Sequence, residues 1–190
     1  MKKQGRRITK IIPVFIIGLL CIVAVMAGCA TQEESIDWNV TLVGSEGQQE
    51  TLSYEEIKAM PSYTGRGGFF TTVGLVNGPY KAKGVLIEDL CELVGGITSS
   101  DVVTISAVDG YLMAFDYDEV MGNINTYDLE LHEVSQGELK VILMYEQDGK
   151  PLSDSDGKPF RLAIVGTDNL LTEGHYWVKW VDSVEVKRKA

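Results

Sequence analysis

Two glycine and proline turns followed by a mostly apolar run constrain the fold of this chain most strongly. The turns are Asp148-Gly149-Lys150-Pro151 and Asp156-Gly157-Lys158-Pro159, and the run is Phe160 to Val165. Glycine reaches positive φ without a steric cost and proline fixes φ, so each group predicts a tight turn. The run has the length and composition of a buried strand. The segment therefore predicts two turns followed by a buried strand.

Arg161 is the second residue of that run. A buried strand holds an arginine only at a large desolvation cost, unless its guanidinium reaches a carboxylate, a phosphate or solvent. Arg161 is therefore the first candidate ligand-binding residue.

The spacing from Gly149 through Pro151, Leu152, Gly157, Pro159, Arg161 and Gly166, followed by Val178-Lys179-Trp180, resembles the molybdopterin-binding domain of the sulfite oxidase family. Three upstream stretches are also similar to that family: a strand and short helix ending at Met60-Pro61, the segment Gly84–Gly95, and Asp109-Gly110-Tyr111. The resemblance extends from Trp38 to Val186. It implies a sulfite-oxidase-type fold of mostly mixed β-sheet with few short helices.

Local patterns independently predict an α+β domain in which strands predominate. Ser53 with Glu55 and Glu56 is typical of a helix N-terminus. An amphipathic helix is expected over Gly84–Gly95, with an apolar inner face of Leu86, Leu90, Leu93 and Val94. Arg66–Gly68 is expected to be a flexible lead, and Asn77-Gly78-Pro79 a turn. Strands are expected at the segments 38–43, 69–76, 102–107, 139–145, 160–165 and 177–186.

The N-terminus carries five basic residues before an uncharged apolar segment, Ile11 to Ala27, which is followed by Gly28 and Cys29. Small residues before a cysteine are typical of a bacterial lipoprotein signal, in which the cysteine is lipidated. The alternative is a retained membrane anchor, since the segment is just long enough to span a bilayer. We expect a signal peptide at 1–28, a lipidated tether at 29–36 beginning with Cys29, and the domain at 37–187. The domain would then be anchored to the cell membrane and face outside the cytoplasm.

Removal of residues 1–28 changes the formal charge from −10 to −15, because the segment has five basic and no acidic residues. So acidic a chain lacks the basic face that nucleic acid requires. Cys91 would be the last cysteine besides Cys29 after this cleavage. It lies among apolar helix positions and is expected to be a packed core thiol, so no intramolecular disulfide is expected.

In the family that the chain resembles, a cysteine thiolate binds molybdenum, and cationic side chains hold the pterin phosphate and the substrate. Alignment of Thr72-Val73-Gly74 with the cysteine motif places Thr72 at the cysteine position, and a threonine is a poor molybdenum ligand. Asp156 stands where the family often has a histidine, and Tyr176 where it has a lysine. The resemblance implies cofactor contacts from the residues Arg161, Lys179, His175, Asp109 and Tyr111.

Other chemistry has less support in the sequence. The acidic loop at Asp154–Asp156 does not place ligands at the positions of an EF-hand, and no histidine and cysteine cluster has zinc spacing. His132 lies in a polar stretch, and His175 is read by itself as structural. The carboxylates Asp109, Asp116 and Asp118 are typical of turns and strand edges.

Two functions follow from these observations. We favour a non-enzymatic module on a molybdopterin-binding-like domain, which binds a small anionic ligand at Arg161 and Lys179 or a partner protein. The alternative is an active molybdopterin-dependent oxidoreductase that passes electrons to an extracytoplasmic redox partner.

Overall fold

The computed structural model describes residues 36–135 and 137–189, which belong to one compact unit. The predicted signal peptide and Cys29 lie outside the described residues, as does all of the tether except Ile36. No helix in the described part combines the length and the apolar character that crossing a bilayer requires.

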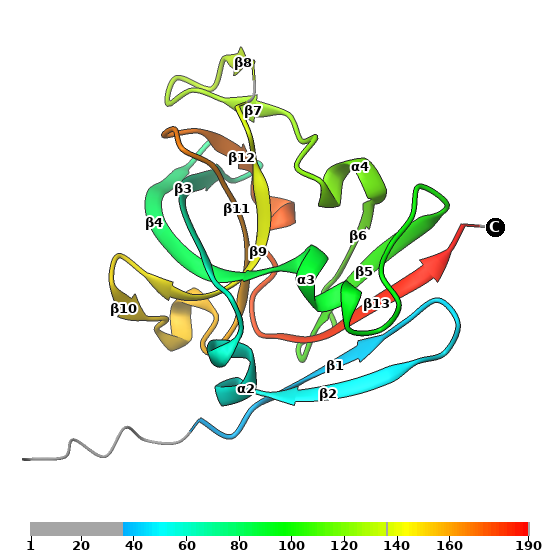
Figure 1. The fold of residues 1–190 in the computed structure, drawn as a ribbon. Helices are drawn as coiled ribbons and strands as arrows, with labels where there is room; N and C mark the ends of the chain where they lie inside the picture. The colour runs from blue at the N-terminus through cyan, green and yellow to red at the C-terminus, as the bar shows by residue number, and fades with distance from the viewer. Residues whose placement is uncertain (1–35, 136, 190) are drawn as a thin grey trace, which may run out of the picture. The chain divides into compact units, whose positions relative to one another are not determined.

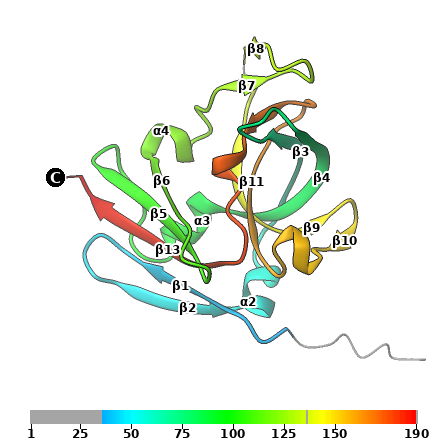
Figure 2. The same cartoon turned by 180° about the vertical axis from the view of Figure 1, so that it is seen from behind.

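The unit contains two β-sheets, which lie side by side in Figure 1 and in the opposite view of Figure 2. The smaller sheet has the order β2-β1-β13-β5-β6. Its β1 and β13 are parallel, and its other neighbours are antiparallel. Its strands are β1 (Asn39–Val43), β2 (Gln49–Ser53), β5 (Asp101–Ala107), β6 (Leu112–Asp116) and β13 (Val181–Arg188).

The larger sheet has the order β10-β9-β4-β3-β12-β7-β8, and β11 pairs with β9 on the edge opposite β4. Its β3 and β12 are parallel. Its strands are β3 (Tyr63–Phe70), β4 (Val76–Leu86), β7 (Thr126–Tyr127), β8 (Glu133–Val134), β9 (Lys140–Gln147), β10 (Lys150–Pro151), β11 (Arg161–Val165) and β12 (Leu171–Glu173).

Helices in the described residues are short. They are α2 (Tyr54–Ala59), α3 (Ile87–Glu92) and α4 (Tyr117–Val120), with single 3₁₀ turns at η2 (Asp154–Asp156) and η3 (Gly174–Tyr176). Ser53 begins α2 with a capping box, in which its hydroxyl accepts from the Glu56 amide and Glu56 accepts from the Ser53 amide. The predicted α+β class of mostly mixed sheet with few short helices is confirmed.

The main hydrophobic core lies between the two sheets, because it takes side chains from both. Helix α3 contacts strands of each sheet and contributes Ile87, Leu90 and Cys91 to this core. A second apolar cluster lies on the other face of β9 and β11 and includes Ala163, Val165 and Trp177. Both faces of β11 are therefore buried, which explains why its sequence is apolar without alternation.

Side-chain alternation along β11 fixes the direction of Arg161. Leu162 and Ile164 point into the main core, whereas Ala163 and Val165 point into the second cluster. Successive residues of a strand face opposite sides, so Arg161 shares the face of Ala163 and Val165. It points toward Trp177 and away from the core between the sheets.

The expected course of the chain around β3 and β4 was wrong. Arg66–Gly68 is part of β3, and Asn77-Gly78-Pro79 lies inside β4. The chain reverses direction earlier, between Thr71 and Leu75. There the Leu75 amide donates to the Thr71 hydroxyl, and the Thr71 amide donates to the Leu75 carbonyl. Gly67 serves close packing, since a Cβ there would lie 2.1 Å from the Ile164 carbonyl oxygen.

Two other boundaries also differ from the predictions. Helix α3 begins at Ile87, because the segment from Gly84 to Leu86 still pairs with β9. The Leu93 side chain is 45% exposed, so it does not belong to the inner face. The last strand begins at Val181, and just before it Lys179 forms an isolated bridge with Arg161 at the start of β11.

Candidate functional site

The two predicted turns form as expected and place Arg161 at the start of β11. Gly149 and Gly157 have φ values of 78° and 100°, which glycine alone adopts without strain. A Cβ at Gly157 would lie 2.8 Å from the Lys179 Cβ, so this glycine also lets η2 approach the segment before β13. The turns thus bring Arg161 and Lys179 together.

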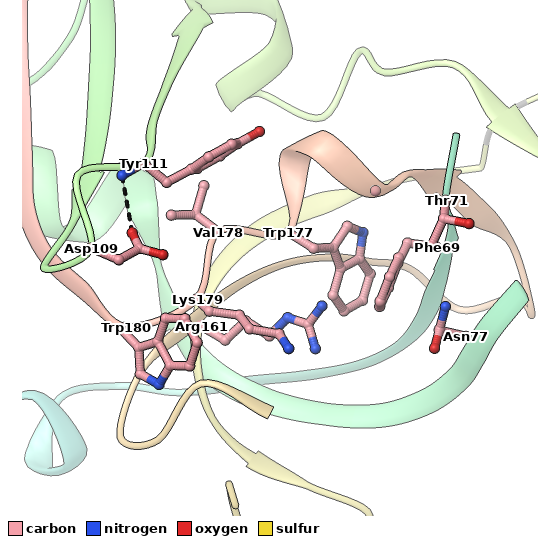
Figure 3. A pocket seen from close by; sticks show the side chains of 11 residues that line it. Phe69, Thr71, Asn77, Asp109, Tyr111, Arg161, Trp177, Val178, Lys179 and Trp180 are labelled. Carbon is pink, nitrogen blue, oxygen red and sulfur yellow. Dashed lines mark hydrogen bonds between the residues drawn. The ribbon is translucent and has the colours of Figure 1, made fainter. Parts of the chain in front are cut away.

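Arg161 and Lys179 line a cavity of about 460 Å³. Asp109 and Tyr111 line it from the turn between β5 and β6. Figure 3 shows these side chains with the aromatic residues Phe69, Trp177 and Trp180, which form much of the remaining wall. We call this the first cavity. Four of the five residues predicted to contact a cofactor therefore meet at one place.

Arg161 is buried and forms no ion pair with the described residues. Its side chain is 4% exposed, and no ion pair joins it to a carboxylate of residues 36–135 or 137–189. Its Nε atom is buried and has no hydrogen-bond partner in that part of the chain. Burial lowers the pKa of Arg161 from its ordinary value, while Tyr80 and Asp156 act in the opposite direction. A buried, unpaired guanidinium favours an anion from outside the chain.

Two aromatic rings hold this guanidinium in place. Its central carbon lies 4.6 Å from the ring centre of Phe69 and 5.4 Å from that of Trp177. The two rings are themselves 5.2 Å apart, and the Trp177 indole N–H donates to the Thr172 hydroxyl at 2.9 Å. Cation–π contacts with rigidly held rings use the flat face of arginine and leave its N–H edge for a ligand.

Lys179 supplies the second positive charge of the first cavity. Its ammonium donates to the Ser155 carbonyl and lies 5.8 Å from the centre of the Trp180 ring. Burial and the charge of Arg161 lower the pKa of Lys179, and Asp156 partly opposes them. Asp156 does not line the cavity, but its carboxylate acts on both cations. An anion would relieve the repulsion between Arg161 and Lys179.

Asp109 and Tyr111 form a fixed turn at the rim of this cavity. The Tyr111 amide donates to the Asp109 carboxylate at 3.0 Å, as the dashed line in Figure 3 shows. The Tyr111 hydroxyl donates to the His175 carbonyl, also at 3.0 Å. The predicted turn role of Asp109 is therefore observed, and Tyr111 links the β5–β6 turn to η3.

His175 and Thr72 line a second cavity of about 360 Å³. This second cavity shares Phe69, Thr71 and Gly174 with the first, so the two adjoin. Thr72 is exposed, in the loop between β3 and β4. The structure therefore brings the expected cysteine position and all five predicted contact residues to one pair of cavities.

Tyr176, His132 and Cys91 lie outside both cavities. The Tyr176 hydroxyl donates to Glu119 at 3.0 Å, and its ring packs on Phe115. His132 pairs with Asp128 in an exposed position. Cys91 is 1% exposed, and burial raises the pKa of its thiol to about 12, as expected of a core cysteine.

Sequence reasoning missed the aromatic walls and Glu173. Trp177 and Trp180 lie on either side of Lys179 in the sequence, and two tryptophans so close to a candidate ligand-binding lysine were the available signal for an aromatic pocket. Trp180 has φ 54°, a left-handed conformation that a bulky residue adopts rarely. No local pattern pairs Glu173 with His175 across the start of η3, where their side chains lie 3.1 Å apart.

The family model of the oxidoreductase molybdopterin binding domain matches residues 27–190. This chain belongs to that family. Among solved structures, the family domain is similar to the sulfane dehydrogenase SoxCD from Paracoccus pantotrophus, with a TM-score of 0.64 and 18% sequence identity. The match covers 85% of this chain but only 41% of that one, so it shows the fold. A search of curated proteins found no match.

The residues of this family member fit only part of the cofactor that the family name implies. Arg161 and Lys179 suit the phosphate of a molybdopterin, since charge-assisted bonds to phosphate are strong. A thiolate for the metal has no source in the described residues, where Cys91 is the one cysteine and lies in the core between the sheets. Thr72 at the second cavity offers a hydroxyl, which suits molybdenum poorly. The site fits an anion better than a thiolate-bound metal.

Proposed function

We propose that this domain is a binding module that holds a small anionic ligand between Arg161 and Lys179. The single observation that carries the proposal is the buried guanidinium of Arg161, which lines a cavity and has no carboxylate partner among the described residues. Burial of a charge has a large desolvation cost, and without an ion-pair partner that cost is not compensated. An anionic ligand offsets it.

The size of the first cavity indicates an organic ligand. A volume of about 460 Å³ lies within the range of about 300–1,000 Å³ that is common for small-molecule sites. The rings of Phe69, Trp177 and Trp180 supply the apolar wall that such sites usually have. We infer that an acidic group binds at the two cations while the rest of the ligand lies against these rings.

We further propose that the module is a lipoprotein facing outside the cytoplasm, with Cys29 lipidated and residues 29–36 as tether. The proposal rests on the basic N-terminus, the apolar segment and the small residues before Cys29. A lipid at Cys29 makes the membrane the permanent partner of the domain 37–187. Nucleic acid is not among the proposed partners, since the chain is strongly acidic.

The alternative is a molybdopterin-dependent oxidoreductase that passes electrons to a redox partner protein. Membership of the oxidoreductase molybdopterin-binding family supports it. The hydroxyl of Thr72 at the expected thiolate position and the core location of Cys91 weigh against it. We therefore place ligand binding ahead of catalysis.

Calorimetric titration of the full chain in mild detergent with sulfate tests the binding proposal. Sulfate keeps its charge across the neutral range, so its affinity reports on the protein alone. We expect saturable binding that Arg161→Met and Lys179→Met each weaken by at least tenfold, which is about 1.4 kcal/mol. The matched control is Arg66→Met, because Arg66 is exposed on β3 and bonds to Asn169. Equal affinity in all four proteins would contradict the proposal.

Mass spectrometry of the membrane-extracted protein tests the anchor. We expect a chain that begins at Cys29 and carries added acyl mass, whereas Cys29→Ser should leave the chain without that mass. A wild-type chain that begins at Met1 would contradict the proposed lipoprotein and support a retained anchor.

A further inference from the structure

The second cavity has a charge character opposite to that of the first. Its lining contains the carboxylate of Glu173 together with His175, Thr71 and Thr72, and it contains neither arginine nor lysine. The first cavity contains Arg161 and Lys179. Because the cavities adjoin at Phe69, Thr71 and Gly174, one molecule can reach both.

Glu173 sets the orientation of the His175 ring. Its Oε2 atom lies 3.1 Å from His175 Nδ1, and its Oε1 atom accepts from the Tyr127 hydroxyl at 3.5 Å. A neutral imidazole carries one proton, and the carboxylate draws it to Nδ1. Nε2 then becomes a hydrogen-bond acceptor. None of the hydrogen bonds within residues 36–135 and 137–189 uses that nitrogen.

Packing against Tyr176 further fixes this ring, since the two ring centres are 4.1 Å apart. The Tyr111 hydroxyl holds the backbone of His175 from the β5–β6 turn. Gly174, the first residue of η3, packs tightly against β3, since a Cβ there would lie 2.9 Å from the Phe70 carbonyl oxygen. The acceptor is therefore held on a rigid turn in the second cavity, next in sequence to Gly174, which lines both cavities.

The ionisable groups around His175 are mostly acidic or phenolic. They come from β12, β7, α4, η3 and the β5–β6 turn, and the cations lie in the adjoining cavity. The groups are Glu173, Tyr127, Glu119, Tyr176, Asp109, Tyr111, Arg161 and Lys179. With a neutral His175 imidazole, the second cavity is thus an acceptor site with the Glu173 carboxylate behind it.

We propose that the ligand of this site is dipolar, with an acidic group bound at Arg161 and Lys179 and an ammonium or other N–H donor bound at His175 and Glu173. The inference rests on the proposed anion site and specifies the chemical class of its ligand. Phe69 and Phe70 line the second cavity and add aromatic surface beside the cationic group.

Matched pairs of acids test the proposal with the full chain in detergent. The probes are γ-aminobutyrate against butyrate and ε-aminocaproate against caproate, because members of a pair differ by one terminal ammonium. At pH 8 we expect the amino acid of the better-fitting length to bind about fivefold tighter than its partner, the gain of one partly exposed ion pair. Glu173→Gln keeps the shape of the side chain and should remove this gain. The control His132→Gln should keep it, since His132 pairs with Asp128 away from both cavities.

The outcomes separate this inference from the proposed anion site. The dipolar ligand is overturned if the amino acid gains no affinity over the plain acid, or if its gain survives Glu173→Gln. In either case, Arg161-dependent binding of the plain acid would still support the anion site. If neither acid nor sulfate binds in an Arg161-dependent way, the anion site fails and the inference fails with it. Circular dichroism and thermal unfolding confirm that each variant is folded.

Discussion

Replacement of Arg161 by methionine should leave the ligand-free fold as stable as the wild type or more stable. Arg161 is 4% exposed and has no carboxylate partner in the described chain. Desolvation of such a charge costs several kcal/mol, and methionine keeps most of the side-chain volume without it. The variant loses two cation–π contacts, at 4.6 Å and 5.4 Å, each worth about 0.5–2 kcal/mol.

Since the desolvation cost exceeds these contacts, we expect the free energy of unfolding of Arg161→Met to rise by about 1 kcal/mol. For a domain of this size that raises Tm by about 3 °C. With sulfate at a hundred times the wild-type Kd, the wild type should gain about 2.7 kcal/mol, and the variant, with at least tenfold weaker binding, no more than about 1.4 kcal/mol. Thermal unfolding followed by circular dichroism, with and without sulfate, measures both effects.

The control for this experiment is Arg66→Met, which removes an exposed arginine and should keep the sulfate response. A loss of more than about 2 kcal/mol in ligand-free Arg161→Met would refute the reasoning, because it would show that Arg161 stabilises the fold by itself. Full sulfate stabilisation in Arg161→Met would refute the assignment of Arg161 to the anion site.

Three further predictions concern the fold. The unfolded Cys91 thiol ionises near pH 8.5 and the folded one near pH 12, so the free energy of unfolding should fall by up to about 1.4 kcal/mol per pH unit as pH rises through this window. Denaturant titration should show a smaller fall in Cys91→Ala. Hydrogen bonds from Thr98 lower the pKa of Asp101, so its contribution is present above about pH 4 and is lost in acid; Asp101→Asn should flatten the acid limb of the Tm profile. Gly67→Ala should lower the unfolding free energy by more than about 2 kcal/mol, since its Cβ would meet the Ile164 carbonyl at 2.1 Å; an unchanged denaturation midpoint would contradict this packing.

The sequence predicted the parts of the fold that depend on local chemistry. The capping box at Ser53, the turns at Gly149 and Gly157 and the buried strand from Arg161 to Val165 all follow from short-range preferences. Arg161 was predicted from its place in an apolar run, and the other site residues were found through a resemblance. The structure gives the physical reason for their assembly. Arg161 and Lys179, far apart in sequence, meet because η2 packs on the segment before β13.

Most of what the sequence did not predict depends on contacts between distant strands. Gly67 and Gly84 look like flexible or helix-starting residues, but each lets a neighbouring strand approach closely. Leu93 fits the apolar pattern of a helix that starts at Gly84, but Gly84 to Leu86 pair with β9 instead, and Leu93 is exposed. Glu173 became visible as the partner of His175 only when β12 and η3 were placed. Local propensity carries no information about such pairings.

Molybdenum content tests the central claim most directly. The full chain should be produced in a host that makes molybdopterin, and its molybdenum and released pterin measured per mole, beside the variant Thr72→Cys. The account predicts far less than one molybdenum per wild-type chain and a higher content in Thr72→Cys, because the cavity lacks a thiolate that this change supplies. One molybdenum per wild-type chain would contradict the account and establish a metal site without a cysteine ligand at position 72.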